Sequence, residues 1–166
     1  MMGLRRIAAY LVDYIVILLW LGLIFSAAML GLIGINDPDV WTGADRWIAQ
    51  AQAFLMVTLP VYLYFTISES RGRKATPGKR LLGLTVDGTP LQIMQRNLVK
   101  FLPWEVAHTA IWHGMPLPAA SEPTPLGLTL MCLSMAAAGL YIISLFIGSG
   151  RTPYDRISGT QVVRAT

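Results

Sequence analysis

The sequence predicts an all-α polytopic membrane protein with four transmembrane helices and a small cytoplasmic β-hairpin or cap. Two properties of the chain lead to this prediction: 54% of its 166 residues are hydrophobic and only 13% are charged. A soluble domain of this length would carry about a quarter charged residues. The apolar residues gather into long runs, which is typical of membrane spans. We therefore expect a single membrane domain over residues 1–166, whose net charge of +4 comes from basic loops beside the spans.

The first apolar run, Ile7–Ile35, is long enough to cross the bilayer with tilt, or to break near Gly31 and Gly34. Two arginines in front of it resemble the start of a secretory signal peptide. The run is far longer than the hydrophobic region of such a peptide, and it contains Asp13. We therefore interpret it as a retained helix.

Three further segments are candidate spans. Trp47–Ser68 and Leu126–Ile147 are both of spanning length, and Pro60 predicts a kink whose freed carbonyl group a neighbour must satisfy. The segment Leu98–Met115 is ambiguous, because it contains Lys100 and several other polar side chains. Hydropathy alone would make it an interfacial or re-entrant segment.

The basic residues favour one topology. If all four segments cross from a cytoplasmic N-terminus, twelve of the 13 basic residues lie on the cytoplasmic side: eleven in the N-terminus and in segments 69–97 and 148–166, and Lys100 at the start of the third segment. The outer side then holds Arg46 and four acidic residues, which are Asp37, Asp39, Asp45 and Glu122. With three crossings the C-terminal arginines would lie outside. Because cytoplasmic loops are enriched in Lys and Arg, we predict four spans with both termini cytoplasmic, and a re-entrant third segment is the alternative.

The segment between the second and third spans predicts a short folded cap. Thr76 can cap a helix that starts at Pro77 and ends near Gly83. After it, Leu84–Val86 and Leu91–Ile93 flank an Asp-Gly pair, which is a favoured two-residue hairpin turn. We expect a small hairpin, with a proline placing the second strand at an edge.

The C-terminal tail repeats the first part of this cap. Thr76-Pro77-x-x-Arg80-x-x-Gly83-x-x-Val86 matches Thr152-Pro153-x-x-Arg156-x-x-Gly159-x-x-Val162, with five of eleven positions identical at an offset of 76. One interpretation is a parallel duplication of two spans and a cap, related by an axis along the membrane normal. The other is that two interfacial caps use the same turn chemistry.

A carboxyl group inside the first run is the leading candidate for a functional residue. Arg6, Tyr10 and Asp13 lie on one helical face, with Asp13 about 10 Å deeper than Arg6. A carboxylate at that depth costs several kcal/mol unless it is paired, hydrated or protonated. Asp13 is therefore either a structural ion-pair partner or an ion or proton site.

Glu105 and His108 form a second polar cluster, because their spacing places them on one face of a helix. The imidazole can exchange protons near neutral pH. Alternatively, this face meets water or headgroups, with Trp104 and Trp112 as interface anchors. Glu-x-x-His is also a metal-ligand spacing, but a carboxylate-bridged centre needs a second such motif, so we expect no metal site.

The basic segments carry three further candidates. Asp155, between two arginines, predicts a local cap or ion pair near the membrane surface. Lys79 and Arg80 can bind acidic lipid headgroups. The chain has no catalytic triad, zinc spacing, dinucleotide fingerprint or phosphate-binding loop, so we expect neither an enzyme nor a cofactor. Nucleic acid is not expected as a partner, because no basic stripe is interleaved with aromatic residues.

Three stretches together resemble the RDD family of bacterial integral membrane proteins. They are Arg6-Ile-Ala-Ala9-Tyr-Leu-Val-Asp13, Thr76-Pro-Gly-Lys-Arg-Leu-Leu-Gly83-Leu-x-Val86, and Arg151-Thr-Pro-Tyr-Asp155-Arg-x-Ser-Gly159-Thr160-x-Val162. The family takes its name from one arginine and two aspartates, which correspond by position to Arg6, Asp13 and Asp155. The resemblance covers nearly the whole chain and implies a multi-pass protein of the bacterial plasma (inner) membrane.

The resemblance leaves two functions open. A transport role, including cation/proton exchange, has been suggested for some members, which implies a small transporter or transporter subunit for Na⁺, K⁺ or H⁺. Asp13 would then be the coupling carboxylate, tuned by Arg6 and Asp155. Four spans are few for a transport path, so at least a homodimer is expected. The alternative is a non-catalytic scaffold or assembly subunit, whose basic caps bind a partner membrane protein or anionic lipid.

Overall fold

The computed structural model describes residues 2–33, 43–114 and 122–165. Its long helical segments are α1 (Met2–Met29), a continuous helix made of α2 (Gly43–Ala53), the π-helical turn η2 (Phe54–Thr58) and α3 (Leu59–Ser70), then α5 (Pro90–Gly114) and α6 (Pro125–Ser144). A cap is formed by two short helices, α4 (Pro77–Leu81) and α7 (Pro153–Ile157), and two strands, β1 (Leu84–Asp87) and β2 (Gln161–Arg164).

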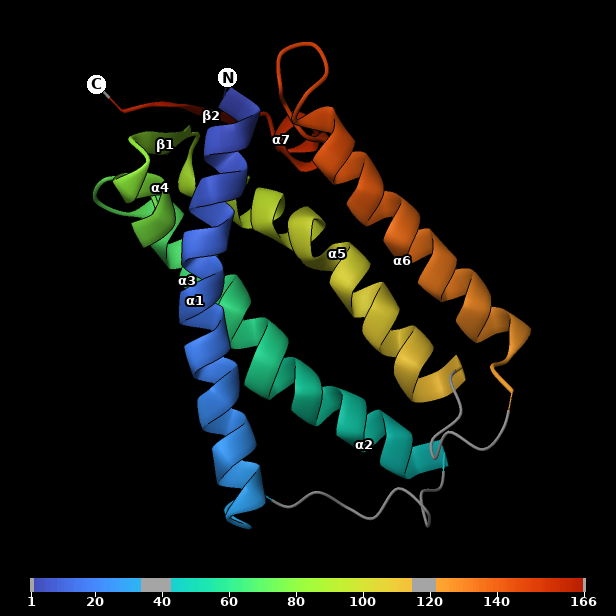
Figure 1. Ribbon diagram of the computed structural model, residues 1–166. Coiled ribbons are helices and arrows are strands. Elements are labelled where there is room, and N and C mark those ends of the chain that lie inside the picture. The colour runs from blue at the N-terminus through green and yellow to red at the C-terminus, as the bar shows by residue number, and fades with distance from the viewer. Residues whose placement is uncertain (1, 34–42, 115–121, 166) are drawn as a thin grey trace.

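The long helical segments run between the cap and the opposite end of the molecule, and both chain termini lie at the cap end (Figure 1). Among the described residues, three helices are long and apolar enough to cross a membrane: Met2–Met29, Gly43–Ser70 and Pro125–Ser144. The third predicted segment is one continuous helix, α5, which starts at Pro90 rather than Leu98. Helix α5 is not one of the three apolar helices, because it carries several polar side chains.

The first helix ends close to the predicted break. Helix α1 stops at Met29, and Gly31 follows in a left-handed conformation with φ of 70°. A glycine adopts this conformation without steric cost, so it is a common residue just after a helix end. The other glycine of the predicted break, Gly34, and the outer acidic residues Asp37 and Asp39 lie outside the described residues.

Two prolines interrupt the long helices, and each freed carbonyl group has a side-chain donor. A proline has no N–H, so the carbonyl four residues before it loses its helical partner. Before Pro60, the Met56 carbonyl accepts a hydrogen bond of 2.9 Å from the Trp20 indole. Before Pro103, the Val99 carbonyl accepts one of 2.9 Å from the Tyr141 hydroxyl. The expectation that a neighbour satisfies the carbonyl group freed by Pro60 is thus confirmed, and Pro103 follows the same rule.

The predicted hairpin is wrong. Strand β1 does not pair with the segment after Gly88; it pairs antiparallel with β2 from the other end of the chain. The segment after Gly88 is helical, because Thr89 and Gln92 form a reciprocal cap in which each side chain accepts from the other's backbone N–H, at 3.3 and 2.9 Å. This capping arrangement, followed by Pro90 at the first helical position, starts α5 and outweighs the turn tendency of Asp-Gly.

The two halves of the cap have the same local structure. Thr76 and Thr152 each cap a short helix with a side-chain oxygen, as predicted for Thr76, and the helices are followed by Gly83 and Gly159 at φ of 64° and 68°. In the sheet, Val86 lies directly opposite Val162, its match at the offset of 76. Thr85 and Asp87 lie opposite Val163 and Gln161, which is the crosswise pairing that a two-fold axis requires. The duplication hypothesis requires like caps on one side of the molecule, and the cap has this arrangement.

The cap is packed onto the helices through a small apolar core. Val86 and Val162 are both buried and belong to one apolar cluster with Leu84, Ala9 of α1 and Ile93 of α5. A second cluster joins α1 to α3 through Ile17, Val61 and Phe65. The sheet therefore covers the ends of α1 and α5, and this positions the polar residues beneath it.

Candidate functional site

Asp13 is fully buried between α1 and α4, and neutral groups satisfy it. It accepts hydrogen bonds from the Tyr64 hydroxyl at 3.0 Å, from the Thr76 hydroxyl, and from the backbone N–H of Gly78 at 2.8 Å. A backbone N–H in the first turn of a helix has no intrahelical acceptor, so Asp13 caps α4 from outside. A Cβ atom at position 78 would lie 2.9 Å from the Asp13 carboxyl group, so this close approach requires glycine. The ion-pair interpretation of Asp13 requires a basic partner, but the observed partners are uncharged: Thr76 and Gly78 belong to the cap, and Tyr64 belongs to α3.

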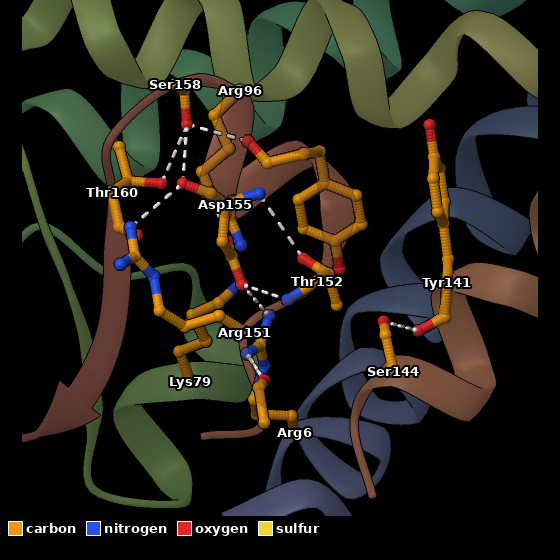
Figure 2. Close-up of polar contacts among 12 residues, drawn as sticks. Arg6, Lys79, Arg96, Tyr141, Ser144, Arg151, Thr152, Asp155, Ser158 and Thr160 are labelled. Carbon is orange, nitrogen blue, oxygen red and sulfur yellow. Dashed lines mark hydrogen bonds and ion pairs between the residues drawn. The ribbon is translucent and has the colours of Figure 1, made fainter. Parts of the chain in front are cut away.

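Arg6 pairs with Asp155 instead. The Nη2 atom of Arg6 lies 2.7 Å from Oδ2 of Asp155, and its Nη1 atom donates to the carbonyl of Gly150 at 2.7 Å (Figure 2). This contact joins the start of α1 to α7, across almost the whole sequence. The predicted site of Arg6, Tyr10, Asp13 and Asp155 is therefore not a single cluster. Arg6 contacts Asp155, whereas Asp13 contacts a different set of residues.

A second carboxylate extends this ion pair into a network. Arg96 of α5 lies between the two acids, with Nε 2.8 Å from Oδ1 of Asp155 and Nη1 2.7 Å from Oε2 of Glu69. Glu69, at the end of α3, also accepts from Lys79 at 2.7 Å and from the amide of Asn97 at 3.1 Å. All of these acids and Arg96 are buried, so the network connects α1, α3, α4, α5 and α7 inside the protein.

The two arginines determine the charge state of Asp155. Burial alone raises the pKa of a carboxyl group, but the nearby guanidinium groups of Arg96 and Arg6 outweigh this effect and hold the pKa of Asp155 below its ordinary value. The backbone N–H of Thr152 donates to the same carboxylate at 3.2 Å, which completes a capping box at the start of α7. Asp155 is therefore an ionised structural anchor.

Of the two residues predicted to face lipid headgroups, Lys79 is buried and Arg80 is exposed. Lys79 is buried in its ion pair with Glu69, so it is not available to a headgroup. Arg80 is exposed, with its Nε atom donating to the carbonyl of Ala75 at 2.9 Å. The reason is helical geometry: neighbouring residues on a helix point about 100° apart, so one of the pair faces α3 and the other faces outward.

Tyr10 belongs to a cluster of aromatic rings beside this network. Its ring stacks on Phe65 at a centroid distance of 6.2 Å. The ammonium group of Lys100 lies 3.3 Å from the centroid of Phe65 and within 5.3 Å of the rings of Tyr10 and Phe101. The amino group of Lys100 therefore lies over the faces of three aromatic rings, which attract a cation.

Glu105 and His108 meet as the sequence predicts, on the side of α5 that faces α2. His108 Nδ1 lies 3.3 Å from Oε1 of Glu105, and the Thr58 hydroxyl, at the end of the π-helical turn, donates to the same oxygen. The Glu105 side chain keeps 25% of its surface exposed. It borders two grooves: one of about 380 Å³ against α2 and η2, and one of about 200 Å³ against η2 and α3.

Further polar contacts continue from this pair toward the end of α5 that lies away from the cap. The side-chain amide of Gln50 donates from its Nε2 atom to the Thr109 hydroxyl at 2.9 Å, and its Oε1 atom lies 2.7 Å from Nε2 of His113. The Thr109 hydroxyl donates to the Glu105 backbone carbonyl at 2.9 Å. In the described part of the chain, no three His, Cys, Asp or Glu side chains gather into a group that could hold a metal ion.

Glu69, Arg96 and Asn97 were not among the predicted site residues. Glu69 had a recognisable signal, because a negative charge in the last turn of a helix opposes the helix dipole and therefore needs nearby cations. Which cations these are depends on how the helices pack, so the sequence could not name them.

Apolar helices of spanning length, joined at one end by buried ion pairs, define a helical integral membrane protein. The chain belongs to the RDD family, whose family model matches residues 3–159. This match confirms the resemblance that the Arg6, Asp13 and Asp155 motifs indicate. No curated protein and no solved structure gives a significant match to the chain.

Proposed function

We propose that this protein is a membrane transporter, or the membrane subunit of one, that moves protons or monovalent cations along the interface between α2 and α5. Glu105, rather than Asp13, is the carboxyl group that exchanges its charge. Helix α5 then crosses the bilayer with the three apolar helices, so that the chain has four spans and both termini are cytoplasmic. The bacterial inner membrane is the expected location.

This proposal rests on a comparison of the partners and the exposure of four carboxyl groups. Asp13, Glu69 and Asp155 are fully buried, and each is satisfied by several donors that belong to the fold. A coupling carboxylate must bind and release a proton or cation, and groups held in this way cannot do so without disrupting the cap. Glu105 instead has one neutral hydroxyl and one titratable imidazole as side-chain partners, and part of its surface is open.

The position of Glu105 fits a route for ions. A carboxyl group inside a membrane segment is costly, so it must reach water, protein or a partner charge. Further polar side chains, Thr109, Gln50 and His113, lie along α2 and α5 between this carboxyl group and the outer end, and they are hydrogen-bonded to one another. A π-helical turn lies opposite it, and such turns often occur at functional sites.

A second copy of the chain is expected to complete the route. The grooves beside Glu105 are lined mainly by apolar residues such as Trp47, Phe54 and Leu98. In a single copy, lipid would fill them and leave Glu105 against hydrocarbon. A homodimer that covers this face would shield the carboxyl group.

The test is ion-driven pH change in proteoliposomes under imposed sodium and potassium gradients. We expect flux from the wild type, loss of flux in Glu105→Gln, and normal flux in Glu122→Gln, a matched change at an exposed carboxyl group outside the helices. Equal flux in Glu105→Gln and the wild type would exclude Glu105 as the coupling group. Absence of flux from folded wild-type protein would exclude transport.

One observation favours the scaffold or assembly subunit as a second candidate. The buried ion network joins five elements, α1, α3, α4, α5 and α7, at the cap end of the molecule, which is a suitable platform for another membrane protein. Purification from native membranes discriminates the two: a scaffold returns a stoichiometric partner, whereas a self-sufficient transporter returns only copies of itself.

A further inference from the structure

The last two residues of α4 and of α7 form matching exposed pairs. They are Arg80 and Leu81 in the first helix, and Arg156 and Ile157 in the second, again at the offset of 76. Both arginines are exposed. The apolar side chains are 74% and 67% exposed, among the highest values for large hydrophobic residues in the described chain.

The symmetry of the cap makes these two pairs structurally equivalent. A two-fold axis of an antiparallel strand pair runs perpendicular to the sheet, and here it passes beside Val86 and Val162. Both valines point to the buried side, onto Ala9 of α1 and Ile93 of α5. The axis therefore relates the end of α4 to the end of α7, so the two exposed pairs occupy equivalent positions in the two halves of the cap.

The charge around these pairs has one sign. In segments 69–89 and 148–165 the acidic residues are Glu69, Asp87 and Asp155, and of these only Asp87 is exposed. The exposed basic residues of the cap and of the N-terminus are Arg5, Arg71, Arg73, Lys74, Arg80, Arg156 and Arg164. A surface of this sign, continuous with membrane helices, is complementary to anionic lipid headgroups.

We propose that the ends of α4 and α7 are paired interfacial anchors for anionic phospholipid in the leaflet on the cap side. Leu81 and Ile157 insert at the boundary between headgroups and acyl chains. Arg80 and Arg156 bind the lipid phosphate groups beside them, since a guanidinium ion forms charge-assisted hydrogen bonds with phosphate oxygens. A protein partner would need the same binding site twice, once for each helix end, whereas a bilayer presents the same headgroups everywhere on its surface. This inference does not depend on transport.

The insertion is tested with an environment-sensitive fluorophore in vesicles of phosphatidylcholine and phosphatidylglycerol. In a Cys132→Ser background, single cysteines replace Leu81, Ile157 and the exposed strand residue Gln161 as the control. Quenching by spin-labelled lipids is expected to be strong and similar at Leu81→Cys and Ile157→Cys, and weak at Gln161→Cys. A water-exposed probe at either helix end, or equal quenching at all three positions, would overturn the proposal.

The headgroup contact is tested by titrating detergent-purified protein with phosphatidylglycerol and, in parallel, with phosphatidylcholine. Arg80→Gln/Arg156→Gln is expected to weaken phosphatidylglycerol binding by roughly tenfold or more, the effect of two basic contacts at a charged surface. Arg73→Gln/Arg164→Gln removes the same charge from exposed positions outside the pairs and is expected to have a much smaller effect. Equal losses in the two double variants would show a diffuse charge effect and contradict the paired sites.

Discussion

Asp155 is held by two arginines that come from different helices, Arg6 of α1 and Arg96 of α5. Asp13, by contrast, accepts from two hydroxyl groups and one backbone N–H. The difference matters, because removing one member of a buried ion pair leaves an uncompensated charge, whereas removing the charge of Asp13 leaves hydrogen-bond donors without an acceptor. The two aspartates are therefore expected to respond differently to substitution and to pH.

Stability should depend on the ionisation of Asp155 in acid. Because its pKa is lower in the folded protein than the unfolded value of about 3.9, the stabilisation is complete above that pH and is lost as the pH falls through the folded-state pKa. We predict that the unfolding temperature in detergent falls steeply below about pH 4.

Asp155→Asn should reduce this dependence and should cost about 3–5 kcal/mol at neutral pH, because Arg6 and Arg96 lose their shared anion. Arg6→Gln is the milder comparison, since it keeps the pair between Arg96 and Asp155. If the variants and the wild type lose stability with the same slope in acid, Asp155 is not the titrating group.

Asp13→Asn is predicted to destabilise the protein by about 1–3 kcal/mol, because the amide NH₂ replaces one acceptor oxygen and then faces a donor from Thr76, Gly78 or Tyr64. Thermal unfolding of the purified protein measures this loss. Asp87→Asn, the same change at an exposed position of the cap, should leave the unfolding temperature unchanged. A stable Asp13→Asn variant that has lost transport would instead restore Asp13 as the coupling group.

The long helices depend on contacts at a few special positions. The carbonyl groups freed by Pro60 and Pro103 are satisfied by Trp20 and Tyr141, each from a neighbouring helix. Far from the cap, α5 and α6 approach so closely at Gly114 and Gly127 that neither position has room for a Cβ atom. Small residues allow helix backbones to meet in this way inside membranes.

Gly114→Ala is therefore predicted to separate the outer ends of α5 and α6 and to lower the unfolding temperature in detergent. The added Cβ atom would overlap the backbone of Gly127, which cannot move as a side chain can. Gly139→Ala in α6 is the matched control: a Cβ atom there meets nothing within 4 Å, and alanine is the better helix former. Equal effects of the two substitutions would show that the helix contact is not close.

The whole molecule places one cap across the ends of its long helices, with both chain termini at that end (Figure 1). The buried ion network lies where the helices converge under the sheet. Because α5 runs alongside α6 to a close contact at the far end, it extends as far from the cap as α6 does. This geometry supports four crossings more strongly than the hydropathy of α5 does.

Labelling of single cysteines in a Cys132→Ser background tests the topology. We predict that an impermeant maleimide labels Glu122→Cys from outside intact cells, and labels Asp87→Cys only after the membrane is opened. Four crossings place these exposed residues on opposite sides of the bilayer. Labelling of both positions from the same side would mean that α5 does not cross.

Local chemistry and composition determined a large part of this protein in advance. The apolar runs predicted the long helices, and the cap at Thr76 was predicted from a threonine followed by a proline, a pattern that the repeat carries to Thr152. The motifs around Arg6, Asp13 and Asp155 identified the family. These features depend on hydropathy, helical period and turn residues, all of which act over a few neighbouring positions.

The tertiary structure decided what contacts what across the chain. It joined β1 to β2, which are more than 70 residues apart in sequence, and it gave Asp13 neutral donors while Arg6 went to Asp155. It also brought Glu69 to Arg96 and Lys79. Pairings of this kind have no local signal, because a strand edge or a buried charge accepts any complementary partner, and only the packing of the helices determines which one comes within reach.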